Sequence, residues 1–135
     1  MKALDTNVLA RFFIDDADDP QAAKQRPAAV AALSERAFVP LTVLLEFEWV
    51  MRGFYALPRL DMVRVMRALV GIEHLTLEDR GAVLNAIDSF AVGLDFADAM
   101  HLARSGRAAG FATFDRKLAG RARKLGLVPA VDLLS

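Results

Sequence analysis

Four carboxylates in this sequence stand where an α/β fold could use them for chemistry: Asp5, Glu46, Asp98 and Asp115. Carboxylates that converge on one edge of a sheet repel one another and need a cation to stay ionised together. The chain has no Cys and only two His, which leaves hard oxygen ligands and favours Mg²⁺ or Mn²⁺. The chemistry expected of such a site is metal-assisted hydrolysis of a phosphate ester.

Asp5 and Asp115 each lie between a short apolar run and a helical segment. At the carboxyl ends of parallel strands, such residues point toward the edge where α/β proteins collect their ligands. The competing interpretation is structural, because an aspartate in this position often caps the helix that follows. For each residue taken alone, capping is the favoured interpretation.

Glu46 lies in the segment LTVLLEFEWVMRGFY, which is apolar nearly all round and is predicted to be a buried helix. Its neighbour Glu48 has Arg52 four residues later, a favourable local ion pair. Glu46 has no such cation one turn away, so its burial requires compensation from a distant group. A metal ion or a catalytic role is one interpretation, and a long-range salt bridge is the other.

Asp98 lies in the helical segment LDFADAMHLARSG, where Asp95 is predicted to be the N-cap. One interpretation of Asp98 is structural, as the capping partner of Asp95. Asp98 also shares a helix face with His101 and is flanked by apolar or small residues, which favours a functional role. His101 itself is expected to be an ordinary hydrogen-bonded residue of the core.

Short strands that alternate with longer helices should position these residues. Strands are predicted at 2–4, 37–39, 72–75, 111–114 and 128–131. Helices are predicted at 7–13, 21–35, 41–55, 58–70, after a capping box at Thr76 and Asp79 as far as 92, at 95–109 and at 115–125, with Gly126 as C-cap. This alternation predicts a parallel sheet covered by helices on both faces, and one α/β domain over residues 1–135.

The bulk composition limits the classes that remain. No apolar run is long enough to span a membrane, and Asp5 interrupts the N-terminal apolar stretch too early for a signal peptide, so a cytoplasmic protein is expected. The net charge is zero, but residues 1–99 hold 10 basic and 15 acidic side chains, whereas residues 100–135 hold 7 and 2. This asymmetry gives either a positive face for a polyanion or simply a solvated outer side of a C-terminal helix.

Four fragments, LDTNVLARF, VLLEFEWVM, DFADAMHLA and FATFDRKL, resemble in that order the PIN-domain nucleases, and most closely the VapC-type toxins of bacterial toxin–antitoxin pairs. The similarity runs from residue 3 to about residue 131. It implies a three-layer α/β sandwich, with a short central parallel sheet of about four or five strands flanked by about seven helices.

The resemblance also implies roles for individual residues. Asp5, Glu46, Asp98 and Asp115 would be the catalytic acids and hold one or two Mg²⁺ or Mn²⁺ ions. Supporting roles are implied for Thr6, Asn7, Asp95 and Thr113. Metal-activated water would attack an RNA phosphodiester and leave a 5′ phosphate and a 3′ hydroxyl.

The resemblance further implies a homodimer silenced by a cognate antitoxin protein, and Trp49, Phe54 and Tyr55 are compatible with such interfaces or with the core. The candidates for contact with the RNA backbone are basic residues of the C-terminal third: Arg104, Arg107, Arg116, Lys117, Arg121, Arg123 and Lys124. Two alternatives stay open: a PIN nuclease of RNA processing that is no toxin, and a non-catalytic PIN scaffold that binds a protein partner. Receiver and dehalogenase-type phosphatase folds do not fit, because their acid patterns are absent.

Overall fold

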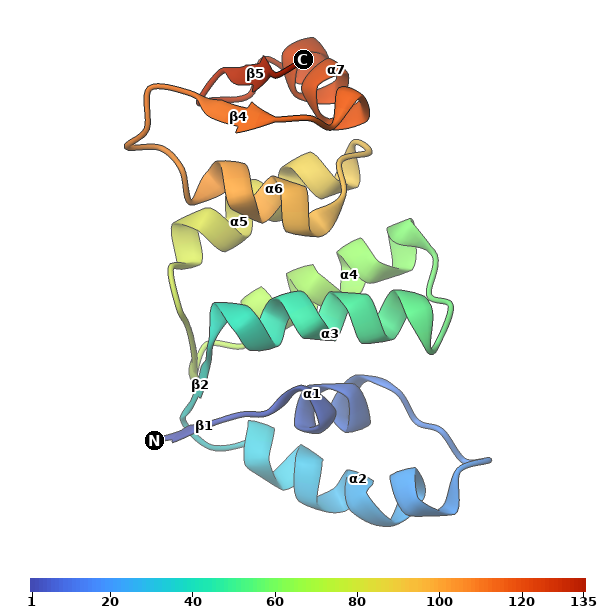
Figure 1. Cartoon of the computed structure of the whole chain (residues 1–135). Helices are drawn as coiled ribbons and strands as arrows, with labels where there is room; N and C mark the ends of the chain where they lie inside the picture. Colours follow the sequence, from blue (N-terminus) through green and yellow to red (C-terminus); the bar gives the residue numbers. More distant parts are fainter. The chain divides into compact units, whose positions relative to one another are not determined.

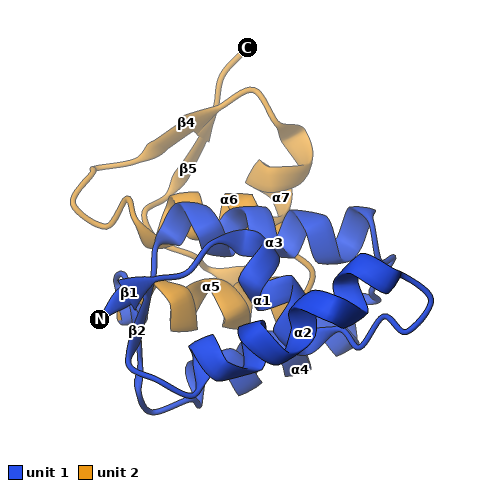
Figure 2. Cartoon of the chain, turned by 90° about the horizontal axis from the view of Figure 1, so that it is seen from below, with its two compact units in different colours: residues 1–80 blue, residues 81–135 orange.

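A computed structural model describes all residues, 1–135, and contains seven helices and five short strands (Figure 1). The chain forms two compact units, unit 1 at Met1–Arg80 and unit 2 at Gly81–Ser135 (Figure 2). All strand pairs are parallel, as the alternation of strands and helices predicts. The α/β class with parallel strands and seven helices is therefore confirmed, but the strands form a three-stranded sheet and a separate two-stranded sheet instead of one central sheet of four or five. The single domain over the whole chain stays a prediction.

Unit 1 holds three strands and four helices. Their bounds are β1 (Lys2–Ala3), α1 (Thr6–Phe13), α2 (Pro20–Leu33), β2 (Ala37–Val39), α3 (Leu41–Gly53), α4 (Arg59–Val70) and β3 (Leu75–Leu77). The strands pair in the order β1-β2-β3, and α1 packs against both α2 and α3. Phe47 of α3 is fully buried and its ring lies 5.7 Å from that of Phe13. This packing holds the first turn of α1 close to α3, which brings residues 40 positions apart into contact.

Unit 2 holds three helices and two strands. Their bounds are α5 (Arg80–Ala91, which begins at the last residue of unit 1), α6 (Phe96–Ala103), β4 (Phe111–Thr113), α7 (Arg116–Leu125) and β5 (Val131–Leu133). Strands β4 and β5 form a separate two-stranded ladder, and α7 packs against β5. Phe90 of α5 and Phe96 of α6 meet edge to face with centroids 5.6 Å apart. This aromatic contact fixes the start of α6, where two of the predicted site residues lie.

Several helix ends follow from local sequence signals. Gly71 is the C-cap of α4, and Gly126 ends α7 with a left-handed backbone at φ 65°. Helix α3 begins after Pro40 without a cap from its own residues, and the Glu78 carboxylate accepts a hydrogen bond from the Leu41 N–H at 2.9 Å instead. That cap comes from a residue 37 positions away, which no local pattern indicates.

Two predicted strands lie at shifted positions. Residues 72–74 are outside β3, which covers 75–77 because Leu75 and Leu77 are the side chains that point into the core when paired with β2. The last strand covers 131–133 instead of 128–131, and Pro129 lacks the N–H that a ladder position needs. In both cases the pairing partner decides the register.

Two helix predictions were also wrong. The capping box fails because Thr76 belongs to β3, while Asp79 has a positive φ of 53° and α5 begins after it. Helix α6 ends at Ala103 instead of 109, and the Ser105 hydroxyl donates to the His101 carbonyl at 2.6 Å. A serine that satisfies a helix carbonyl in this way favours termination. None of the helices has the length and apolar character that crossing a membrane requires.

Candidate functional site

Asp5 follows β1 and is the N-cap of α1. Its backbone is extended, at φ −82° and ψ 163°, and its carboxylate accepts a hydrogen bond from the Thr6 N–H at 2.7 Å. Asp5 therefore does cap α1, as the structural interpretation predicts. The side chain is nevertheless exposed, so capping leaves carboxylate lone pairs open to solvent or to a ligand.

Thr6 connects the first acid to the second. Its side chain is buried, with 5% of its surface exposed, and its hydroxyl donates a hydrogen bond to Oε1 of Glu46 on α3. The same residue thus holds Asp5 through its backbone and Glu46 through its side chain. A hydrogen bond to an ionised carboxylate is stronger than a neutral one, so Thr6 orients Glu46 effectively.

These residues share one pocket of unit 1, the acid pocket, with a volume of about 340 Å³. Its lining consists of Asp5, Thr6, Asn7, Ala10, Arg11, Glu46, Val50, Phe54 and Tyr55. Two of the four predicted acids and both of their predicted supporting residues, Thr6 and Asn7, therefore lie together. The structure brings this half of the predicted site into one place.

Glu46 is not buried, contrary to the prediction from the apolar sequence of its helix. Glu46 is exposed, whereas Glu48 is the buried acid of α3, with 3% exposure. Glu48 is paired with Arg52 at 2.9 Å, as its spacing predicts. The helix is not buried on all sides either, because Trp49 is 64% exposed. An apolar composition did not reveal that α3 presents one face to solvent.

In unit 2, Asp95 and Asp115 cap the helices α6 and α7. Asp95 accepts a hydrogen bond from the Asp98 N–H at 3.2 Å, and Asp115 accepts one from the Leu118 N–H at 3.0 Å. The Thr113 hydroxyl accepts from the Asp115 N–H at 3.0 Å, so Thr113 helps to set the turn that presents Asp115. Asp115 is exposed, which again leaves a capping carboxylate free to act.

Asp98 has an electrostatic environment unlike that of the other acids. Burial raises the pKa of its carboxyl above the usual value of 3.8, and the negative charges of Asp95 and Asp115 raise it further, while His101 lowers it. Asp95 and Asp115 therefore each lie within electrostatic reach of Asp98. A cation would relieve this repulsion.

Neither unit by itself gathers three or more His, Asp or Glu side chains closely enough to hold a metal ion. The predicted site residues thus form two groups: Asp5 and Glu46 with Thr6 and Asn7 in unit 1, and Asp98 and Asp115 with Asp95 and Thr113 in unit 2.

A family model, described as the PIN domain, matches residues 2–124. The chain belongs to the PIN-domain family. This membership places it among the nucleases, whose members typically depend on a divalent metal. No curated protein and no solved structure matches the chain significantly.

His101 of this PIN domain is an exposed residue, contrary to the expectation of a core position. Its ring stacks on Phe111 of β4, with centroids 6.3 Å apart and planes inclined by 15°. The stacking joins α6 to β4 and explains the position of His101 without a catalytic role.

The basic residues predicted to contact RNA occupy the surface of unit 2. Arg116, Lys117 and Arg121 are exposed on α7, and Arg121 donates to the Gly93 carbonyl at 2.9 Å. Arg104 and Arg107 lie at and beyond the end of α6 instead of within a helix, because α6 is shorter than predicted. Arg116 and Lys117 expose their charges to solvent, where a polyanion binds.

Sequence reasoning missed Arg11 of α1. Arg11 lies one helical turn after Asn7, on the same face, and lines the acid pocket of the PIN domain. The i,i+4 spacing from Asn7 was the available signal. Tyr55, considered only as an interface or core residue, lines the same pocket.

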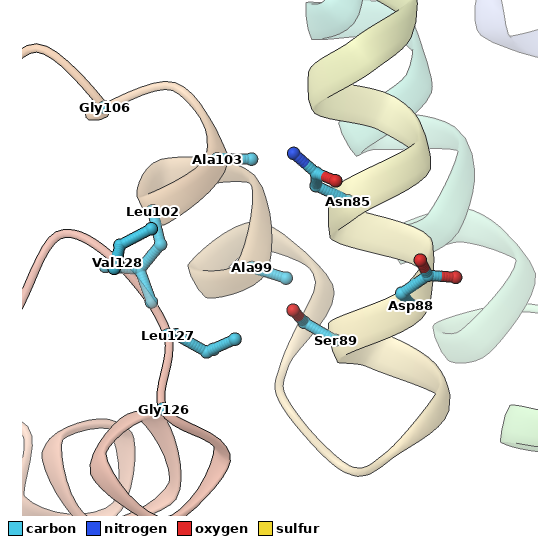
Figure 3. Close-up of a pocket in the computed structure, with 10 residues that line it drawn as sticks. All are labelled: Asn85, Asp88, Ser89, Ala99, Leu102, Ala103, Gly106, Gly126, Leu127 and Val128. Carbon is cyan, nitrogen blue, oxygen red and sulfur yellow. The ribbon is translucent and has the colours of Figure 1, made fainter.

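A separate pocket of about 410 Å³ lies entirely in unit 2 (Figure 3). Asn85, Asp88 and Ser89 line it from α5, and Ala99 and Ala103 line it from α6. None of the four acids predicted for the PIN-domain site lines this pocket, so it is distinct from the candidate site.

Proposed function

We propose that this PIN-domain chain is a metal-dependent endoribonuclease and acts as the toxin of a type II toxin–antitoxin pair in the cytoplasm. The observation that carries the proposal is the link through Thr6, which holds Asp5 and Glu46 in one pocket. The acids of unit 2 supply the second argument, because burial and like charges raise the pKa of Asp98.

We propose that Asp5, Glu46, Asp98 and Asp115 together hold one or two Mg²⁺ or Mn²⁺ ions. The donor set fits these ions, because every proposed ligand is a carboxylate and the chain contains no Cys. The repulsion that Asp95 and Asp115 each exert on Asp98 also fits a site that is completed by a cation.

The bound ions would supply charge stabilisation at the phosphate and an acidified water as nucleophile. Thr6 orients Glu46, and Thr113 sets the turn at Asp115, so the protein contributes pre-organised acids to the reaction. The cations of α7 would hold the RNA backbone while hydrolysis leaves a 5′ phosphate and a 3′ hydroxyl.

We further propose a homodimer and a cognate antitoxin as partners. Trp49 and Leu60 of unit 1 are 64% and 69% exposed, which supports a protein interface because large apolar side chains gain from being covered. Sedimentation of the purified protein would test the dimer, and a monomer at micromolar concentration would contradict it.

The double substitution Asp5→Asn with Asp98→Asn tests the catalytic proposal. We expect it to abolish both Mg²⁺-dependent RNA cleavage and growth arrest on expression in bacteria. Asp18→Asn is the matched control, because Asp18 is an exposed acid of unit 1 that lies outside the acid pocket. Chelation of the metal should silence the parent protein and the control alike.

The single variants decide whether both acid groups serve one metal site. If they do, the losses of Mn²⁺ affinity in Asp5→Asn and Asp98→Asn should be strongly non-additive, because neither group then binds independently. Purely additive losses would contradict a shared site. A double variant that cleaves RNA as fast as the parent would show that the acids are structural caps only.

A further inference from the structure

Arg11 is held in the acid pocket by neutral partners only. Its Nε donates to Oε1 of Gln25 at 3.0 Å, and its Nη1 donates to the Tyr55 hydroxyl at 3.1 Å. No carboxylate lies within salt-bridge distance of Arg11, although Asp5 and Glu46 line the same pocket. The guanidinium is therefore held from α2 and from the turn that follows α3, and it forms no salt bridge with either carboxylate.

This arrangement leaves both charge and donors available. A guanidinium has five N–H donors, of which two are used here, and it remains protonated at any physiological pH. An arginine is planar and matches the oxygens of a phosphate well when neutral partners orient it and no salt bridge occupies it. The position of Arg11 in the acid pocket thus indicates an anion as its partner.

Phe54 adds an aromatic surface to the same pocket. It is the C-cap residue of α3, and 74% of its surface is exposed although it is a large apolar side chain. Its ring meets that of Tyr55 edge to face, with centroids 4.8 Å apart and planes inclined by 82°. Tyr55 therefore contacts both Arg11 and Phe54, which couples the cation to the exposed ring.

We propose that Arg11 and Phe54 form a subsite for one nucleotide of single-stranded RNA beside Asp5 and Glu46. Arg11 binds a phosphate of this nucleotide, and Phe54 stacks on its base. That the ligand is RNA rests on the proposed function. That it carries a phosphate and a base is inferred from the chemistry of Arg11 and Phe54. A paired base is stacked within its helix, so the subsite selects unpaired RNA.

The subsite predicts how variants change RNA affinity in the absence of metal. Binding of a fluorescein-labelled single-stranded RNA to the full chain is measured by anisotropy in EDTA. Phe54→Leu should weaken binding about tenfold, which is the lower part of the range for one base stacked on an aromatic ring. Phe54→Trp should keep the parent affinity, because it keeps a ring.

The logarithm of the RNA association constant falls linearly with the logarithm of the salt concentration, and Arg11→Gln should make this fall less steep by about 0.7, the value for one phosphate contact on a single strand. Lys24→Gln is the control for charge alone, because Lys24 is an exposed cation of unit 1 outside the pocket, and it should change the slope much less. Tyr55→Phe removes the hydroxyl that orients Arg11 while keeping both aromatic rings. Its RNA affinity should lie between that of the parent protein and that of Arg11→Gln. Thermal denaturation confirms that each variant is folded.

Abasic substitution along the RNA completes the test. One abasic position should abolish the effect of Phe54→Leu, because the base that stacks is then missing. Equal effects of Arg11→Gln and Lys24→Gln, an unchanged affinity in Phe54→Leu, or equal binding of a duplex would overturn the subsite. An unchanged RNA affinity in all pocket variants would assign the pocket to a protein partner.

These outcomes are separate from those of the catalytic proposal. Binding is measured without metal, so a chain that binds RNA through Arg11 and Phe54 but never cleaves it would refute the nuclease and leave the subsite intact.

Discussion

Thr6→Val tests whether the hydrogen bond to Glu46 organises the acid pocket. Valine has nearly the shape of threonine and leaves the backbone N–H that donates to Asp5, so only the donor to Glu46 is removed. Bonds to ionised groups contribute about 1.5–3 kcal/mol to stability, but Glu46 is exposed and water replaces the lost donor. We therefore expect a loss of about 1 kcal/mol, seen as a fall in Tm of about 3 °C for a chain of this size.

The effect on function should be larger than the effect on stability. Loss of a residue that orients a metal ligand typically costs about 10–100-fold in metal affinity or activity. Calorimetric titration with Mn²⁺ and the rate of RNA cleavage measure this loss. Thr6→Ser keeps the hydroxyl and is the matched control, which should retain most of both.

The combination with Glu46→Gln decides the cause. If Thr6 acts through Glu46, adding Thr6→Val to Glu46→Gln should lower metal affinity little further, because the group being oriented has already lost its charge. A full additional loss in the double variant would refute the reasoning. So would a Thr6→Val protein with unchanged Mn²⁺ affinity and cleavage rate.

Two further predictions concern stability. Asp98→Asn should raise Tm at pH 7, because burial and the acidic neighbours raise the pKa of Asp98 and make its charged form unfavourable in the folded state. The gain in Tm should vanish below the ordinary pKa of 3.8, where the carboxyl is protonated in both the folded and the unfolded state. An equal gain in Tm at pH 3 would contradict this origin. Gly126→Ala should destabilise the protein by about 1 kcal/mol, because Gly126 has a left-handed backbone at φ 65° and an added Cβ, with nothing within 4 Å, would meet no clash that could account for the loss otherwise. Gly120→Ala, inside the same helix, should stabilise the protein by about 0.5–1 kcal/mol. Urea denaturation measures both changes, and the same sign for both would be inconsistent with a left-handed C-cap.

The helices of this protein could be predicted well because their signals are local. A glycine at position 126 and an aspartate at 115 mark the two ends of α7 by the conformations and hydrogen bonds that those residue types favour. The strands were less predictable, since β3 is defined by its pairing with β2, a partner more than 35 residues away. The sequence of a short apolar run does not determine which residues pair with the neighbouring strand.

By itself, the sequence determined the residue types and the family pattern: the PIN domain, the parallel α/β class and the absence of thiol ligands all follow from it. Only the tertiary structure decided which acid of α3 is buried, because Glu46 and Glu48 differ by two positions on one helix and only the packing of the folded chain distinguishes their faces. It also decided that Thr6 joins Asp5 to Glu46 and that Arg11 lines the same pocket without forming a salt bridge to either carboxylate. These contacts connect residues up to 44 positions apart, and proximity of that kind is a property of the packed chain.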